Sequence, residues 1–453
     1  MDQRDSVQRR AFLAGIGSLG FISLGACQSG SAANSSSMNL VRGFETDLDM
    51  FRSEIVTQDP SYSPVQRTKA LQTLANVERG LSKASLASLH LSLAKITAMA
   101  GNGHTSLLNT NWQNLFQRIP VRFLFLSSGL YVGHASNTWK HLEDHQVLSI
   151  NGFSVNELES RWAVYQGGQA GWRKQFIYHF LEAPELLASA GVGNNPDRIE
   201  LACRDGAGKT KNVTIKAQPL AVEFDGIEEF IPPPRLQLVY KLRDVKAPYY
   251  LSEPEEPFRY RTLEKNKIAY LQFRTNIDFS GKRDIVQFAA DVEESLRQDR
   301  PVHLIVDQRL NWGGDLTTTR ALMERLPSFV SGQVFLLTSG RTFSAGISSS
   351  AYLKQAGGDQ VTILGEPVGD DLEFWAEGDL LNLPTLQANL LYARERHNYR
   401  TGCPEADCHA NIQHNPIRIK TLAPDVPVSP SQDDFLAGRD PVIEKVLDIT
   451  KVI

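Results

Sequence analysis

Residues 38–100 carry a helical pattern of apolar side chains. Leucine, isoleucine and phenylalanine recur there every three to four positions, which is the period of one helix face. A proline-containing loop at 59–64 interrupts the pattern, so we expect one helix before it and two after it, at 65–81 and 85–99. The last helix should end at the Gly-Asn-Gly sequence 101–103, where residues tolerant of positive φ stop a helix.

Residues 118–220 follow a strand pattern instead. Apolar side chains alternate at 121–126, and 129–133 reads as the next strand. A further strand should end at the tight-turn sequence Ile-Asn-Gly at 150–152, and a helix should follow it. The segment 160–198 has helical character, and a hairpin around 206–208 closes the region.

From residue 266 onward, strands alternate with helices. The strand at 302–307 is almost continuously apolar, as expected for a strand buried in a parallel sheet. The alternation indicates βαβ units, and with the preceding regions it predicts a multidomain fold of mixed α+β and α/β class. The predicted strands are 267–273, 302–307, 334–338 and 361–364, and the predicted helices are 285–296, 317–326 and 344–356.

Residues 1–37 are typical of an export signal rather than of the fold. The sequence R-R-A-F-L at 9–13 resembles a twin-arginine signal, and the apolar run after it is too short for a permanent membrane span. The run ends in L-G-A-C at 24–27, which resembles a lipobox, whose cysteine is acylated. We expect a lipid anchor at Cys27, a flexible tether at 28–37 and a periplasmic location on a bacterial membrane, with the outer membrane as one option. A plain secretory signal with a chance cysteine is the alternative.

Charge and composition narrow the choice of partners. The chain has 453 residues, 42% hydrophobic and 22% charged, which is ordinary for a soluble globular protein. Its 47 basic and 51 acidic residues nearly balance, which argues against a nucleic-acid partner. No motif calls for an organic cofactor.

The remaining cysteines suggest a small loop. In an oxidising compartment, Cys403 and Cys408 are most simply paired as a disulfide. The alternative is a metal site that also uses His409 and His414, although zinc motifs usually have tighter, paired spacing, and we therefore expect no metal. Cys203 is expected to be a buried single thiol.

Turns that follow the predicted parallel strands carry the candidate chemistry. They lie at 307–315, 338–346 and 365–369, and the carboxyl ends of parallel strands share one edge of a sheet. Ser344 stands at the head of a predicted helix, where its hydroxyl is exposed and neighbouring amides point at a developing oxyanion. A serine at a helix start is, by itself, more often just an N-cap. The candidate oxyanion donors are the backbone amides of Gly313, Gly314 and Ala345.

The ordered motifs D-x-R-x-N-x-G-G, T-x-S-A-G and G-E-x-x-G resemble the tail-specific (C-terminal-processing) and tricorn-core serine peptidases, an S41-like family. The resemblance covers residues 266–380 closely, and V-L-S-I-N-G at 147–152 is similar to a PDZ module. It implies a core of the ClpP/crotonase type. The implied divisions are a signal, lipobox and tether at 1–37, a helical region at 38–117, a PDZ-like domain at 118–220 and a peptidase core at 221–453.

The branches of this family differ in the general base. Tail-specific proteases take a lysine from the third motif, which here reads G-E-P-V-G-D-D at 365–371 and has no lysine. The tricorn-type branch uses a histidine in G-D-x-H-T, which resembles G-N-G-H-T at 101–105. The resemblance therefore implies His104 as the base, since imidazole takes up a proton near neutral pH. A carboxylate should orient His104. The preferred candidate is Glu366, and the alternatives are Asp371 and Glu377.

The resulting expectation is hydrolysis of peptide bonds through an acyl-enzyme on Ser344, without a metal or cofactor. Its partners would be a peptide or protein substrate and, through the lipid anchor, a membrane. The PDZ-like unit would bind a peptide terminus by strand addition. Two alternatives stay open: an inactive peptide-binding lipoprotein on a peptidase scaffold, and a non-peptide acyl hydrolase.

Overall fold

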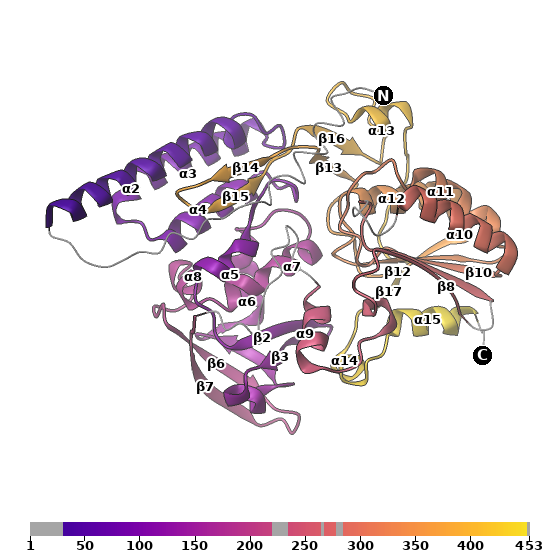
Figure 1. The fold of residues 1–453 in the computed structure, drawn as a ribbon, viewed down its shortest axis with the longest axis horizontal. Helices are drawn as coiled ribbons and strands as arrows, with labels where there is room; N and C mark the ends of the chain where they lie inside the picture. Colours follow the sequence, from indigo (N-terminus) through magenta and orange to yellow (C-terminus); the bar gives the residue numbers. More distant parts are fainter. Residues whose placement is uncertain (1–29, 220–233, 264–266, 278–283, 451–453) are drawn as a thin grey trace.

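The computed structural model describes residues 30–219, 234–263, 267–277 and 284–450. The N-terminal helices and an antiparallel sheet lie at one end of the molecule, and a mostly parallel sheet with its helices lies at the other (Figure 1). Cys27 and the export motifs fall outside the described residues, so their assignments stay predictions. Within the described residues, no helix is both long and apolar enough to cross a membrane.

The predicted N-terminal helices are present. α2 (Gly30–Phe51) runs into a short π-helical turn at Arg52–Val56, and α3 (Pro64–Gly80) and α4 (Leu86–Ala98) follow. Ser63 begins α3 through a reciprocal capping box with Gln66, which satisfies amides that the first turn leaves without partners. Residues 30–37 belong to α2, which corrects our expectation of a flexible tether there. Neither proline nor glycine occurs between residues 31 and 42, so the helix can extend back toward residue 30.

An antiparallel sheet follows, in the strand order β2-β3-β4-β6-β7, with β5 paired to β4. Helices occupy the segment between β5 and β6, as the sequence predicted for 160–198. The strands are β2 (Val121–Leu126), β3 (Gly129–Ala135), β4 (Gln146–Ile150), β5 (Phe153–Ser154), β6 (Arg198–Arg204) and β7 (Thr210–Lys216). The helices are α5 (Trp112–Leu115), which precedes β2 in the chain, and α6 (Val155–Trp162), α7 (Ala170–Leu181) and α8 (Pro184–Ser189), which lie between β5 and β6.

The second large sheet has the order β17-β12-β11-β10-β9-β8, and all neighbouring strands are parallel except β8 and β9. One of its faces packs against α10 and α12, and the other packs against α15 (Figure 1). The strands are β8 (Phe258–Leu263), β9 (Ile268–Phe273), β10 (His303–Asp307), β11 (Val334–Thr338), β12 (Val361–Gly365) and β17 (Val426–Pro427). The helices are α9 (Arg235–Arg243), α10 (Ile285–Asp299), α11 (Arg320–Arg325), α12 (Ala345–Gly357), α13 (Ala410–His414), α14 (Gln432–Ala437) and α15 (Pro441–Thr450).

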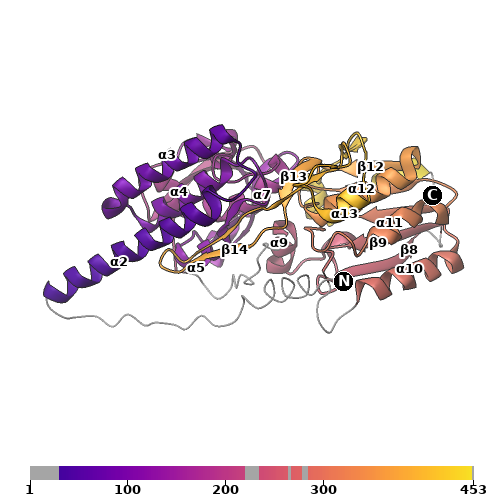
Figure 2. The same ribbon diagram turned by 90° about the horizontal axis from the view of Figure 1, so that it is seen from above.

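A long arm connects the two ends of the molecule. β13 (Glu373–Ala376) pairs with β16 (Glu395–Asn398) beside the parallel sheet. β14 (Leu380–Leu383) and β15 (Ala388–Leu391) continue the arm to β1 (Ser106–Leu108), next to the N-terminal helices (Figures 1 and 2). The sequence analysis did not identify these strands, because they are short and lie outside the βαβ pattern.

The D-x-R part of the first motif holds the parallel sheet to its last helix. The Arg309 guanidinium donates to the carboxylates of Asp307 (Nε to Oδ1, 3.0 Å) and Asp440 (Nη1 to Oδ1, 2.9 Å). The ring of Tyr250 lies 3.9 Å from the guanidinium carbon. Asp440 Oδ1 also accepts the first amides of α15, so one buried cation fixes both the end of β10 and the start of α15.

We predict that Arg309→Met lowers the free energy of unfolding by about 3–5 kcal/mol, because two buried carboxylates lose their shared cation. Urea denaturation of the purified chain measures the change. Arg297→Met is the matched control, since Arg297 is 55% exposed and pairs with Glu293 at the surface of α10. A change equal to that of the control would contradict a structural role for the buried ion group.

Candidate active site

Ser344 stands between β11 and α12 in a strained backbone conformation. The loop before it is fixed to the end of β10, because the Thr342 hydroxyl donates to the Gln308 carbonyl (2.8 Å) and the Ser339 hydroxyl donates to the Arg309 carbonyl (2.6 Å). Ser344 has φ 51° and ψ −126°, a region that residues other than glycine rarely adopt. Such strain persists only where the surroundings impose it, and it is concentrated at functional sites. The half-buried side chain makes no cap hydrogen bond to α12, so the N-cap interpretation of Ser344 does not explain its position.

The Gly-Gly turn of the first motif packs directly against Ser344. A Cβ atom on Gly313 would lie 2.7 Å from the Ser344 Cβ, so the turn excludes any side chain at this position. The Gly313 amide donates to Asn311 Oδ1 (3.1 Å), and this predicted oxyanion donor is therefore occupied in this conformation. Within the described residues, no hydrogen bond uses the amides of Gly314 or Ala345. These two amides stay candidates for an oxyanion.

Asn276 joins the Gly-Gly turn to α12. Its amide nitrogen donates to the Ala345 carbonyl (3.2 Å) and to Ser349 Oγ (2.9 Å), both on α12. Its carbonyl oxygen accepts from Asn311 (2.8 Å), and its backbone amide donates to the Gly313 carbonyl (2.7 Å). The sequence analysis missed Asn276, since it follows β9 outside every motif. Its place three residues after a parallel strand was the one available signal.

His104 lies between aromatic rings, next to the loop that leads to Ser344. Its imidazole is stacked between Phe343, the residue before Ser344 (4.3 Å between ring centres), and Phe374 of β13 (5.2 Å). Both ring nitrogens are buried and have no hydrogen-bond partner among the described residues, so His104 and Ser344 are not bonded in this conformation. Burial, and next the neighbouring His397, lower the pKa of His104 to about 3, while Glu377 opposes the shift. His104 is therefore a neutral imidazole, the form that can accept a proton.

Buried polar contacts hold the His104 loop. The Gly103 amide donates to Asp370 Oδ2 (3.0 Å), and Asn102 Oδ1 accepts the Trp375 amide (3.1 Å). The Thr105 hydroxyl donates to Asp59 Oδ2 (2.7 Å). Asn102 thus anchors the loop to β13 through its side-chain oxygen, and its amide nitrogen donates to the Thr105 hydroxyl (3.1 Å).

Small residues allow α7 to approach the loop between β11 and Ser344. A Cβ atom on Gly340 would lie 2.4 Å from the Gly171 backbone, so the first turn of α7 lies against the turn that leads to Ser344. The Gln169 amide also donates to the Gly369 carbonyl (3.0 Å), in the third motif. The start of α7, within the region 118–220 that the sequence assigned to a PDZ-like domain, thus packs against the loop before Ser344.

The structure separates the candidate carboxylates. Glu366, the preferred candidate, has its charge near the buried phenols of Tyr178 and Tyr250 and makes no contact with His104 among the described residues. Asp371 pairs with Arg400 at the surface. Glu377 is the carboxylate whose charge acts on His104. Burial would raise the pKa of Glu377, but the His397 imidazole, whose Nε2 lies 3.4 Å from Glu377 Oε1, and the nearby imidazoles of His409 and His104 lower it to about 2.

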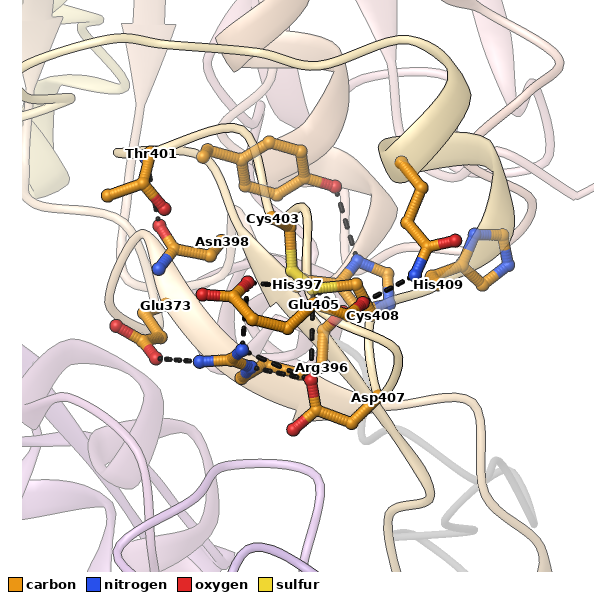
Figure 3. Close-up of a disulfide and its surroundings, with 12 residues drawn as sticks. Glu373, Arg396, His397, Asn398, Thr401, Cys403, Glu405, Asp407, Cys408 and His409 are labelled. Atoms are coloured by element: carbon orange, nitrogen blue, oxygen red, sulfur yellow. Dashed lines mark hydrogen bonds and ion pairs between the residues drawn. A yellow bond between two sulfur atoms is a disulfide. The ribbon is translucent and has the colours of Figure 1, made fainter.

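Cys403 and Cys408 form a disulfide in the loop after β16, which agrees with the disulfide expectation (Figure 3). Because their sulfurs are bonded to each other, these cysteines do not form the alternative metal site in this structure. The His409 Nδ1 accepts the Asn411 amide (3.2 Å) and caps α13. The Cys403 sulfur lies 3.5 Å from the Arg396 carbonyl, so the loop packs directly on β16. Cys203 is a buried free thiol, as predicted.

Comparison with solved structures finds a similar fold in CPAF. No family model and no curated protein matches the chain. Mature CPAF complexed with lactacystin matches at 13% identity and a TM-score of 0.55, over 92% of this chain and 98% of that chain. A mutant of CPAF matches at 13% identity and a TM-score of 0.56, over 92% and 97%. A photosystem II D1 C-terminal processing protease matches less well, at 13% identity and a TM-score of 0.35, over 86% of this chain and 93% of that chain. The chain therefore has the overall fold of CPAF.

We predict a pH-dependent stability from Asp370. Burial raises its pKa to about 7, against the opposing hydrogen bonds from the Asp371 and Gly103 amides. An unfolded aspartate has a pKa of about 4, so between these values the folded chain binds a proton that the unfolded chain does not. The contribution of Asp370 is present below pH 4 and is lost as the pH rises through 7. The melting temperature of Asp370→Asn should fall less between pH 5 and 8 than that of the wild type or of Asp371→Asn. Parallel curves would contradict the assignment.

We predict that the disulfide contributes to stability mainly by restricting the unfolded chain. Closing a loop with a sequence separation of 5 is worth about 2 kcal/mol in the chain-entropy model. Replacing both Cys403 and Cys408 by serine should lower the free energy of unfolding by this amount in urea denaturation. Adding a reductant should bring the wild type to the level of the variant and leave the variant unchanged. If the reductant destabilised both proteins equally, the effect would not come from this disulfide.

Proposed function

We propose that this chain is a serine peptidase in which Ser344 is the nucleophile, His104 the general base and Glu377 the carboxylate that stabilises the charged base. The observation that carries the proposal is the strained Ser344 at the head of α12, packed on the Gly-Gly turn. Its CPAF-like fold and its motifs, which resemble tail-specific and tricorn-core peptidases, support the same function.

The chemistry follows from the groups at this site. His104 accepts the proton of Ser344 Oγ as the oxygen attacks the peptide carbonyl, and the amides of Gly314 and Ala345 stabilise the oxyanion. His104 then gives the proton to the leaving amine, and water hydrolyses the acyl-enzyme. Because the nitrogens of His104 have no partner in this conformation, it loses no hydrogen bond when substrate brings it to Ser344.

The substrate class we propose is a peptide or protein. The antiparallel sheet of β2 to β7 includes the strand β4, which ends in the V-L-S-I-N-G sequence of the PDZ resemblance. A peptide terminus added to such a sheet as a further strand would be bound through backbone hydrogen bonds. With lipid attached at Cys27, the enzyme would work at a membrane surface on the periplasmic side of the bacterial envelope.

One observation favours a second candidate function, a peptide-binding protein without catalysis. The His104 ring is enclosed by Phe343 and Phe374, and the Gly313 amide is already paired. A site kept in this conformation would bind a peptide but would not activate Ser344. A hydrolase for non-peptide acyl groups would use the same serine, and comparing ester with peptide substrates separates it from a peptidase.

We predict that a fluorophosphonate probe labels the full-length chain in detergent at Ser344. Ser344→Ala should abolish labelling, and His104→Ala should slow it about 10⁴-fold, since removing one member of a serine–histidine pair has this effect. Mass spectrometry of the labelled peptide and the rate of labelling are the measurements.

The matched controls are Ser328→Ala and His141→Ala, which change exposed residues away from the site. They should label like the wild type. An unlabelled wild type would favour the binding protein, and labelling that survives in Ser344→Ala would exclude Ser344 as the nucleophile.

A further inference from the structure

We propose that Ser348, Tyr399 and His397 form a relay of buried polar contacts that holds Glu377 in position to serve His104. This inference rests on the proposed peptidase function and adds positioning residues to it. Neither the motifs nor the family resemblance identified Ser348, Tyr399 or His397.

The contacts run in one line from the nucleophile helix to the carboxylate. The Ser348 Oγ lies 2.5 Å from the Tyr399 hydroxyl oxygen, and that hydroxyl lies 3.3 Å from His397 Nδ1. The other nitrogen, Nε2, lies 3.4 Å from Glu377 Oε1. Ser348, Tyr399 and His397 are buried, whereas the Glu377 side chain is 39% exposed. The three relay residues are thus more buried than the carboxylate at the end of the line.

The proton of the Tyr399 hydroxyl can join the middle of this line. The Tyr399 hydroxyl can donate to His397 Nδ1, and its oxygen can then accept from Ser348 Oγ. Burial raises the pKa of Tyr399 well above its ordinary value, which keeps this phenol protonated. The last step, from His397 Nε2 to Glu377 Oε1, is a close polar contact at 3.4 Å and not a hydrogen bond.

The relay and the proposed general base meet at the ring of Phe374. The ring of Phe374 separates the two imidazoles, with His104 at 5.2 Å on one face and His397 at 4.8 Å on the other. Glu377 follows Phe374 by three residues, and its charge acts on His104. The relay therefore anchors Glu377 through the outer histidine and leaves its charge available to the inner one.

Glu377 needs such an anchor because its backbone is strained. It has φ 53°, which is unusual for a residue other than glycine. β16 supplies the anchor, since it carries His397 and leads directly into Tyr399, and the loop closed by the disulfide packs against it (Figure 3). His409 lies next to His397 (5.4 Å between ring centres) and adds a titratable group to this surface.

Ser348 connects the relay to α12, the helix that follows Ser344. Ser348 lies one helical turn after Ser344, so the nucleophile and the first member of the relay belong to the same rigid element. The relay thereby ties the position of Glu377 to the helix that carries the nucleophile.

The test compares two buried tyrosines of the full-length chain. Tyr399→Phe removes the middle of the relay, whereas Tyr352→Phe removes a buried hydroxyl that has no hydrogen-bond partner among the described residues. The readouts are the maximal rate of fluorophosphonate labelling (kinact), the half-saturating probe concentration (KI) and the melting temperature. We expect Tyr399→Phe to lower kinact about tenfold, the lower end of the effect seen for groups that orient a catalytic residue, with KI unchanged. Tyr352→Phe should leave kinact and KI unchanged.

The imidazole itself is tested by a conservative pair. His397→Gln retains an amide that can donate to Glu377 and should keep much of the rate, whereas His397→Phe keeps a ring without a donor and should lose it. Glu377→Gln should lose at least as much rate as His397→Phe, and Glu366→Gln should lose none. Ser348→Ala tests the far end of the relay if Tyr399→Phe does not fold.

The outcomes separate the two proposals. An unlabelled wild type would overturn the peptidase function and with it the relay. A labelled wild type with equal kinact in Tyr399→Phe and Tyr352→Phe would overturn the relay alone. Equal loss in His397→Gln and His397→Phe would show that His397 acts through packing, which also overturns the relay.

Discussion

The guanidinium of Arg309, held between Asp307 and Asp440, is the interaction on which the carboxyl edge of the parallel sheet depends. It neutralises two buried carboxylates at the end of β10, and it fixes the backbone from which the first motif continues. The Arg309 carbonyl then accepts the hydroxyl of Ser339, so the turn that leads to Ser344 is built on the residue that the ion group holds. The D-x-R motif is therefore a structural support for the turn that leads to Ser344.

The arm of β13 to β16 makes one site from two ends of the molecule. His104 comes from the loop after the N-terminal helices, and Ser344 comes from the parallel sheet. The arm joins them, since Asn102 accepts the Trp375 amide of β13 and Asp59 accepts the Ala393 amide just before β16. Aromatic packing from Trp172 through Phe343 to His104 closes the same gap from the side of α7. The geometry of the site thus depends on contacts between regions far apart in sequence.

This arrangement explains which features could be predicted from the sequence. The βαβ strands, the helix of Ser344 and the Gly-Gly turn depend on local periodicity and turn chemistry, and they appear close to their expected positions. The prediction for 317–326 was too long, because α11 begins at Arg320 after a turn whose Thr319 side chain bonds to Asn276. The contacts of Asn276 and Asp370 cross the chain, so no local pattern encodes them. Glu366 was the preferred carboxylate because it lies in a motif, whereas Glu377, which we propose instead, lies on the arm.

The strained backbone at Ser344 has a consequence for the engineering of this protein. Glycine adopts a φ of 51° without a Cβ clash, so a glycine at this position relieves a strain that the native serine maintains. A selection for thermal stability alone would therefore favour loss of the hydroxyl, and with it the proposed nucleophile. Libraries of variants selected for stability should therefore keep serine at position 344, because stability and the proposed activity favour different residues there.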